Sequence, residues 1–411
     1  MPGTRLPQVL RTSLLTVLVA CAVIRVAAQQ PGVLSLGDAT ARAIEANRTL
    51  AAARAARPID AAGILVAGQR PNPEIAFEAA RETPHWAVTG TVPLELSGKR
   101  QRRIDVANAA LAVTEAETLR VTTDLRADVR RAYYQAVGAV RRVAIAQELE
   151  AIQSRARNAA QERFETGAAP RLDSLQAGLA LAQAQNDVSA AQGDVLAARA
   201  ELNALLAYPL DAAPLLADPL DVGALPSRDA AAQEVTARNA ELQVLQKRID
   251  GERARVALAK AMRRPDPSIS ASLTYDAPGE FVFGWRAGAA VALPIFTTGR
   301  PELAVAEATL ARAVADRDAR LAQITGAVSA ALARAAAARQ SVERYQAEIL
   351  PASLQVEQMA EESYRVGQTG LPAYLQTLQA ARDIRQRALQ AGLDYQLALA
   401  DLERAMGTPL R

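Results

Sequence analysis

The sequence is poor in the residues that build metal, redox and catalytic sites. Its 411 residues include one histidine, His85, and one cysteine, Cys21. A single cysteine cannot form a disulfide within the chain, and one histidine with one cysteine cannot make a Cys/His metal site. The chain also lacks a phosphate-binding loop, a GxSxG motif and an HExxH motif. We therefore expect no enzyme activity, no bound metal and no cofactor.

Aromatic residues and excess charge are scarce as well. Aromatic residues make up 4% of the chain although 50% of it is hydrophobic, and alanine supplies much of that apolar content. This composition suits long helices packed along their length better than a globular core of bulky side chains. The net charge is only +3, from 47 basic and 44 acidic residues, so we expect no nucleic-acid partner.

Residues 1–28 are typical of an export signal. A basic segment precedes an apolar run at 14–24 that is too short to span a bilayer, and small residues suited to cleavage end at Ala28. A lipoprotein signal is the alternative, because residues 18–21 fit one that ends before Cys21, the residue that would be lipidated. Both interpretations place the mature chain outside the cytoplasm.

The hydrophobic period changes at residues 93–103. Before this segment, residues 74–79 and 85–96 alternate apolar and polar side chains, which predicts two strands. After it, residues 99–166 contain no proline and have a helical period. An apolar stripe supports this long helix: Val121, Leu125, Val129, Tyr133, Val137, Val140 and Ala144.

The same switch recurs 201 positions later, at residues 294–300. Pro93 and Pro294 lack an N–H and would end strand pairing, whereas Gly98 and Gly299 would let the backbone turn into the helix. We therefore predict a strand-to-helix junction at each site.

The recurrence predicts two copies of one unit, and a constant offset of 200 at Gly167/Gly367 and Pro209/Pro409 supports it. We predict a first repeat at 29–208, a connector at 209–227 and a second repeat at 228–411. The first repeat would contain a helix at 36–69 with a possible kink at Pro58, a β-hairpin at 71–96, a long helix at 99–166, a helical hairpin tip at 163–175 and a helix at 171–206. The second would contain a helix at 228–263, a β-hairpin at 265–295, a long helix at 301–366, a tip at 363–375 and a helix at 371–406.

Each predicted strand has one mostly apolar face about 10 residues long, the length of a tilted strand that crosses a bilayer. Glu74, Glu78 and Arg286 lie on the opposite faces. Four strands cannot close a barrel and lipid tolerates no open sheet edge, so several protomers would have to combine their strands. A soluble sheet that packs its apolar face on helices is the alternative. The helix at 99–166 would be roughly 100 Å long, far longer than a globular core needs.

Several polar residues have two readings. His85 could meet cations at a pore mouth, but a solvent-exposed turn position is favoured. Glu74 and Glu78 are better suited to lining a lumen than to acid–base catalysis. The basic residues at 99–103 could meet lipid phosphates or could form a solvated first turn of the helix.

The chain resembles the TolC-like outer membrane efflux proteins. The resemblance covers about residues 34–409 and rests on the duplicated order helix–strand–strand–long helix–hairpin–helix. It also rests on the segments Pro-Asn-Pro-Glu at 71–74, Pro-Leu-Glu-Leu-Ser-Gly-Lys-Arg at 93–100, Pro-Ile-Phe at 294–296 and the hairpins at 163–167 and 364–367. The segments at 71–74 and 93–100 look most like the CzcC-type branch, which serves heavy-metal efflux pumps.

The resemblance implies a mainly α protein with membrane β-structure. Three copies would form one 12-stranded outer-membrane β-barrel, continuous with a long α-helical barrel in the periplasm of a Gram-negative-type cell. A periplasmic adaptor (membrane fusion) protein would grip the closed end of the tunnel, and an inner-membrane pump, usually of the RND type, would supply the solutes.

The resemblance also implies a gate at the two helical tips, where family members use a network of Asp, Tyr and Arg and an acidic ring. This chain departs from that pattern, because Thr369 stands at the arginine position, and Ala373 and Gln376 stand at the acidic-ring positions. The candidate gate residues are Gly167, Asp173, Tyr364, Gly367, Thr369 and Gln376. Asp173 could equally be a helix cap or a solvated turn residue.

We therefore expect a passive, trimeric outer-membrane export channel in a tripartite, RND-type efflux system, with heavy-metal cations as a possible cargo. A channel for drug efflux or type I secretion is an alternative. A periplasmic coiled-coil adaptor is less favoured, because such proteins carry a lipoyl-like β domain in place of paired transmembrane strands. A secreted hydrolase is disfavoured by the missing nucleophile and base.

Overall fold

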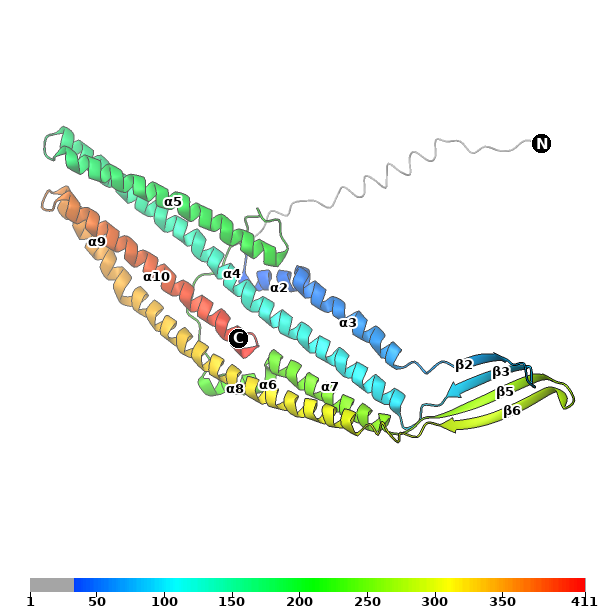
Figure 1. Cartoon of the computed structure of the whole chain (residues 1–411). Coiled ribbons are helices and arrows are strands. Elements are labelled where there is room, and N and C mark those ends of the chain that lie inside the picture. Colours follow the sequence, from blue (N-terminus) through cyan, green and yellow to red (C-terminus); the bar gives the residue numbers. More distant parts are fainter. Residues whose placement is uncertain (1–32, 411) are drawn as a thin grey trace, which may run out of the picture.

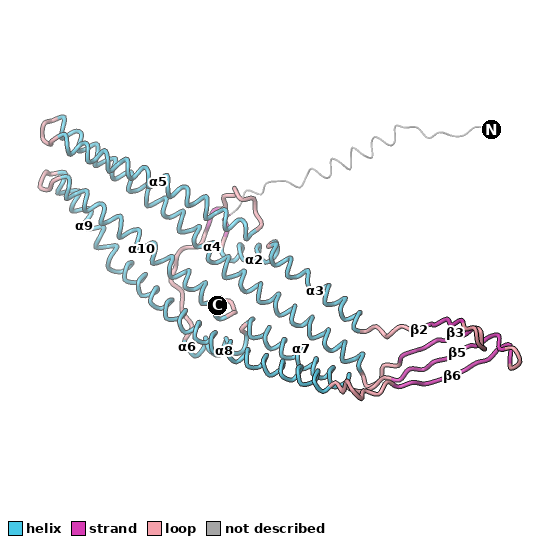
Figure 2. The backbone as a smooth tube through the Cα atoms, in the orientation of Figure 1, coloured by secondary structure: helices cyan, strands magenta, loops and turns pink. Residues whose placement is uncertain are grey.

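The computed structural model describes residues 33–410 and shows a very elongated molecule. A four-stranded antiparallel sheet lies at one end, two helical hairpins lie at the other, and long helices run between them (Figure 1). Colouring by secondary structure shows that all long strands gather at the sheet end (Figure 2). The predicted export signal and Cys21 lie outside the described residues.

The two halves of the chain contain the same order of long helices and paired strands. The first half contains α2 (Leu36–Ala46), α3 (Arg48–Ala67), β2 (Glu74–Ala79), β3 (Trp86–Pro93), α4 (Lys99–Glu165) and α5 (Arg171–Leu206). The second half contains α6 (Arg228–Arg238), α7 (Ala240–Met262), β5 (Pro267–Ala277), β6 (Phe281–Val291), α8 (Arg300–Arg344), a π-helical turn (Tyr345–Ile349), α9 (Leu350–Arg365) and α10 (Leu371–Met406).

The helix that precedes each pair of strands is broken by an asparagine, so the prediction of continuous helices at 36–69 and 228–263 was wrong. Asn47 separates α2 from α3, and its side chain accepts a hydrogen bond from Leu50 N at 3.1 Å. Asn239 separates α6 from α7 in the same way, accepting from Leu242 N at 2.9 Å. Asparagine is a strong N-cap, and here it starts a new helix. The kink considered at Pro58 does not break the helix, because Pro58 lies within α3.

The second long helix contains a π-helical turn that the sequence reading did not anticipate. The turn spans Tyr345–Ile349 and lies just before Pro351, which has no N–H for a helical hydrogen bond. A π-helical turn rearranges the local hydrogen bonds, which lets the helix continue past the proline. Helical structure thus extends from Arg300 to Arg365.

The predicted apolar stripe of the first long helix is buried only in its middle. Val129, Tyr133 and Val137 lie in the core, whereas Val140 is 38% exposed and Ala144 is exposed. The stripe spacing exceeds 3.6 residues, so the stripe drifts around the helix and leaves the face that contacts α10 and α5. A second buried cluster, containing Leu149, Ile152, Ala156 and Ala160, continues toward the tip.

Tyr133 ties the connector between the halves to the core. Its buried hydroxyl donates a hydrogen bond to Leu34 O at 2.8 Å and accepts from Ala217 N at 3.2 Å and Asp218 N at 3.1 Å. These bonds hold the small parallel pair formed by β1 (Val33–Leu34) and β4 (Leu215–Leu216). The connector is therefore anchored by a short β-bridge that its four prolines did not suggest.

Replacing Tyr133 with phenylalanine should lower the thermal stability of the purified protein. The change leaves the part-buried Asp218 N–H without its partner, and it leaves Leu34 O and Ala217 N with only their bond to each other, which costs about 1–3 kcal/mol. Tyr134→Phe is the matched control, because Tyr134 is buried beside it and its hydroxyl has no hydrogen-bond partner among residues 33–410. Equal melting temperatures for the two variants would contradict this role of Tyr133.

Candidate functional site

The strand register places the apolar side chains of all four strands on one face of the sheet. The strand order is β2-β3-β5-β6, and directly opposed residues share a face. Phe77 opposes Val88, Val88 opposes Leu273, and Leu273 opposes Trp285. No helix among residues 33–410 covers this face: Phe77 is 79% exposed and Trp285 is 76% exposed. The soluble alternative, in which helices pack on the apolar face, is therefore not observed.

The opposite face of the sheet is polar. Thr89, Ser272 and Arg286 lie side by side across three strands, and the Thr89 hydroxyl donates to Ser272 Oγ at 3.1 Å. Glu74 and Glu78 lie on the same polar face of β2 and are exposed. Within residues 33–410, no group of three or more His, Cys, Asp or Glu side chains is arranged to hold a metal ion.

His85 adjoins the strand ends farthest from the helices and is not the freely exposed residue that the sequence suggested. Its Nδ1 lies 3.1 Å from Asp276 Oδ2, and its backbone N–H donates to Asp276 O at 3.1 Å. These contacts join the turn between β2 and β3 to the end of β5. His85 is therefore a clasp between the two β-hairpins.

At the first junction the chain leaves β3 at Pro93 and enters α4 after Gly98. Leu94 N still donates to Pro267 O at 2.8 Å, so pairing with β5 ends one residue beyond Pro93. Ser97 and Gly98 both have positive φ angles, 64° and 70°, and the chain turns there. Glycine adopts this conformation without a steric cost, whereas a β-branched residue does not.

The second junction is longer than the first: residues 292–299 separate β6 from α8, whereas residues 94–98 separate β3 from α4. Gly299 precedes α8 and has a φ of 65°, as Gly98 does before α4. However, β6 ends at Val291, three residues before Pro294. Pro294 therefore lies outside the β5–β6 pairing, and the prediction that it ends the strand was wrong. A side chain at Gly299 would also collide with Arg263, whose Cγ would lie 2.8 Å from the new Cβ.

Lys99 joins the first half to the second at the junction. Its ammonium lies 2.7 Å from Asp266 Oδ2 and is almost fully buried, and the other carboxylate oxygen accepts from Leu96 N at 3.1 Å. A buried ammonium without a partner carries a large desolvation cost, so this pair holds the start of α4 against the start of β5.

Two further basic residues of the 99–103 segment bind the end of α3. Arg100 Nε donates to Gly68 O at 2.5 Å. Arg103 donates to Ala67 O at 3.2 Å and to Gln69 O at 2.8 Å, and also pairs with Glu95. The carbonyls at a helix C-terminus carry partial negative charge, so the guanidinium groups stabilise the chain where α3 ends.

At the other end of the molecule, a tyrosine pair forms the centre of the tips. Tyr364 and Tyr374 stack with ring centroids 4.9 Å apart and an angle of 10° between their planes, and both side chains are buried. The Arg163 guanidinium of the first hairpin lies over the Tyr364 ring at 5.2 Å and donates to Tyr364 O at 3.3 Å. Arg163 thus connects the two hairpins through a cation–π contact and a hydrogen bond.

Charge and burial act together on these tyrosines. Burial raises the pKa of Tyr364; Arg163 opposes that rise, and the negative charge of Asp173 adds to it. Burial raises the pKa of Tyr374 to about 12 from 10.0. Folding therefore favours the neutral phenol of Tyr374, and this contribution to stability is complete below pH 10 and lost as the pH rises through about 12.

The remaining predicted gate residues shape the tips without joining one network. Gly167 and Gly367 have φ angles of 75° and 79° and let each hairpin turn. Asp173 lies in the first turn of α5, whose N-cap is Pro170, so Asp173 is not the cap. Thr369 donates through its backbone N–H to Ser363 O at 3.3 Å. The resemblance aligned an arginine of the gate network with Thr369. In this chain the guanidinium that contacts Tyr364 belongs to Arg163.

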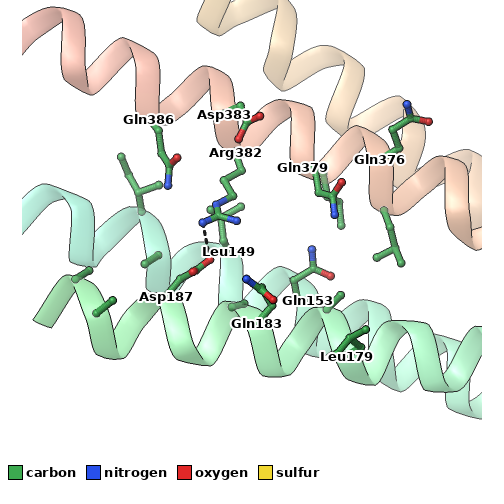
Figure 3. Close-up of a pocket in the computed structure, with 18 of the residues that line it drawn as sticks. Leu149, Gln153, Leu179, Gln183, Asp187, Gln376, Gln379, Arg382, Asp383 and Gln386 are labelled. Atoms are coloured by element: carbon green, nitrogen blue, oxygen red, sulfur yellow. Dashed lines mark ion pairs between the residues drawn. The ribbon is translucent and has the colours of Figure 1, made fainter.

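Gln376 lies in a cleft between α5 and α10, beside the tips. The cleft has a volume of about 770 Å³, and amide side chains from both hairpins line it (Figure 3). Arg382 Nη2 lies 2.5 Å from Asp187 Oδ2 and bridges the cleft. The glutamines that line it are Gln153, Gln176, Gln183, Gln376, Gln379 and Gln386.

Sequence reasoning missed Arg163 and Tyr374. The chain has only eight tyrosines. Two of these eight lie in one tip, and that scarcity was the available signal for Tyr374. Arg163 lies within the hairpin segment that carried the resemblance, but its partner is 201 residues away, so only the folded chain reveals the contact.

The chain is similar to known proteins in both sequence and fold. The sequence profile of the family described as outer membrane efflux protein matches residues 40–207 and 231–408. The cobalt-zinc-cadmium resistance protein CzcC of Cupriavidus metallidurans is 26% identical over 388 residues, which cover 92% of this chain and 90% of that protein.

Two solved outer-membrane proteins share the fold. The outer membrane protein VceC of Vibrio cholerae has a TM-score of 0.74 and 17% identity, and the match covers 91% of this chain and 96% of that one. The open state of the MtrE outer membrane channel of Neisseria gonorrhoeae has a TM-score of 0.71 and 18% identity, with 91% and 89% covered.

Replacing Arg163 with alanine should move the two tips apart. The variant loses the cation–π contact, worth about 0.5–2 kcal/mol, and a hydrogen bond between the hairpins. Spin labels on Glu165 and Arg365, one on each hairpin, should report a longer and broader distance distribution. Arg157→Ala is the control, because exposed Arg157 donates only to its neighbour Asn158. Unchanged distances in the Arg163 variant would exclude it as the tie between the tips.

Proposed function

The chain belongs to the outer membrane efflux protein family, and we propose that three copies of it form one passive export channel. The observation that carries the proposal is the four-stranded sheet whose apolar face is uncovered. Burying such a face in lipid hydrocarbon removes its apolar surface from water. The polar face, with Glu74, Glu78 and Arg286, then lines an aqueous lumen.

The open edges of the sheet support assembly from several copies. Among residues 33–410, β2 pairs only with β3 and β6 pairs only with β5, so each has one unpaired edge. Lipid offers no hydrogen-bond partner to these backbone groups, and four strands are too few to close a barrel. Three copies supply twelve strands, and the helices continue the lumen into the periplasm as a tunnel.

The helical tips would form the end that meets the other proteins of the efflux system. They are the part of the molecule farthest from the sheet (Figure 1), so a sheet in the outer membrane extends the tips toward the inner membrane. A periplasmic adaptor and an inner-membrane pump of the RND type would engage this end. Arg163, Tyr364 and Tyr374 would hold the tips together until the adaptor and pump engage them.

Heavy-metal cations are the cargo that we propose. The relative that carries this proposal is named a cobalt-zinc-cadmium resistance protein and matches nearly the whole length of this chain. A passive channel needs no metal-binding site of its own, since the pump would select the ion. Drug efflux is the alternative cargo that the same channel architecture allows.

An arginine on the apolar face should prevent assembly in the outer membrane. Ala287→Arg places a charge in the lipid-facing row, opposite Ala271, at a cost of about 2–4 kcal/mol per copy near the bilayer centre. Ala290→Arg is the control on the polar face, opposite Ser268. Fractionation and mobility of unboiled samples on gels should show a membrane trimer for the native chain and for Ala290→Arg, and little or none for Ala287→Arg. A soluble periplasmic monomer would refute the channel.

Deleting the gene should sensitise the cell to cobalt, zinc and cadmium salts. Growth inhibition is measured for these salts, for nickel, copper and silver salts, and for a panel of hydrophobic drugs, with and without a plasmid that supplies the protein. We expect lower inhibitory concentrations for metals and restoration by the plasmid. Drug sensitivity without metal sensitivity would remove the metal assignment and leave the channel assignment intact.

A further inference from the structure

The two halves of the sheet are joined by a pairing that has no counterpart within one chain. β3, the second strand of the first half, pairs with β5, the first strand of the second half. The equivalent of β3 is β6, whose outer edge is unpaired, and the equivalent of β5 is β2, whose outer edge is also unpaired. The partner that fits β6 is therefore β2 of a second copy.

The structure itself aligns the two halves residue by residue. The Pro-x-Pro segments at 71–73 and 265–267 make Ala79 equivalent to Leu273. Ala79 opposes Trp86 in the first hairpin, and Leu273 opposes Trp285 in the second. The two opposed partners are both tryptophan, which supports the alignment. Residues 292–293 are then a two-residue insertion after β6, and this explains why Pro294 lies outside the strand.

We propose that β6 of one copy pairs with β2 of the next in one register, with Val291 opposite Ile75, Ala289 opposite Phe77 and Ala287 opposite Ala79. This register transfers the observed β3–β5 pairs, in which Val92 opposes Ile269 and Gly90 opposes Ala271. The inference rests on the proposed trimer and specifies the contact that closes it.

The apolar and polar faces support this register. It keeps Ile75 and Phe77 in the same row as Val291 and Ala289. The apolar face therefore continues across the seam, by which we mean the pairing of β6 of one copy with β2 of the next. A slip by one residue would move every side chain of β2 to the wrong face. A slip by two residues would keep the faces but change the neighbours.

Charge distinguishes the proposed register from one of the two slips by two residues. In the proposed register Glu78 opposes Gly288, which puts it diagonal to Arg286 on the polar face, within reach of a long side chain. Both side chains are exposed, and neither takes part in an ion pair within residues 33–410. A slip that places Val291 opposite Phe77 would move Arg286 four residues from the position opposite Glu78 and beyond its reach. The opposite slip, with Ala289 opposite Ile75, would place Arg286 directly opposite Glu78, so charge does not exclude it. The register observed between β3 and β5 is what favours the proposed pairing over that slip.

Cysteine cross-linking tests the register. The only native cysteine, Cys21, lies ahead of the described residues, and single-cysteine variants control for its participation. Directly opposed residues on paired strands have Cα atoms about 4.5–5.5 Å apart, which suits a disulfide. The pair Phe77→Cys with Ala289→Cys should give reducible cross-links between chains on gels. The pairs of Phe77→Cys with Val291→Cys and of Phe77→Cys with Ala287→Cys represent the two slips by two residues and should cross-link far more slowly.

An internal pair completes the experiment. Gly90 and Ala271 are the equivalent opposed residues within one chain. Replacing both with cysteine shows, by loss of free thiol, that oxidation succeeds. Faster cross-linking of either the Val291 pair or the Ala287 pair than of the Ala289 pair would overturn the register. A trimer on unboiled gels that cross-links through neither pair would overturn the β6–β2 seam while leaving the proposed channel intact. Absence of any trimer would overturn both.

Discussion

The unpaired edges of an apolar sheet are the constraint on which the rest of this molecule depends. The sheet exposes large side chains such as Phe77 and Trp285 on a face that no helix in the described part of the chain covers. In lipid that face is stable, but the backbone groups along β2 and β6 are not, because hydrocarbon accepts no hydrogen bonds. A single chain therefore leaves its own sheet incomplete, and the proposed function and seam are two consequences of completing it with further copies.

The junctions convert this sheet into long helices, and they do so with different chemistry in each half. At the first junction Lys99 and Asp266 form a nearly buried pair, and two arginines bind the carbonyls where α3 ends. The second junction has eight residues, 292–299, between its strand and its helix, against five, 94–98, at the first, and it packs Gly299 against Arg263. The Lys99–Asp266 pair joins the two halves of one chain, and the arginines fix the end of α3 beside the start of α4.

The contact between the tips uses a different arginine position from the one that the resemblance implied. Tyr364 is where the resemblance placed it, but its cationic partner is Arg163 from the opposite hairpin, whereas Thr369 contacts only the nearby backbone. Stacking with Tyr374 and burial of both rings add apolar contacts that depend weakly on salt. The contact between the tips therefore joins an arginine of one hairpin to a buried tyrosine ring of the other, and glutamine side chains, Gln376 among them, line the cleft beside it together with charged residues.

The sequence by itself determined the strands, the long helices and the alternation of faces, because period and proline placement act over a few residues. It also identified Gly98, Gly299, Gly167 and Gly367 as turning points, and all four have positive φ angles. Only the tertiary structure decided the helix breaks at Asn47 and Asn239, the clasp between His85 and Asp276, and the contact of Arg163 with Tyr364. The last two contacts join residues about 200 positions apart. The pattern of neighbouring residues does not indicate which distant group will contact a given charged side chain or aromatic ring.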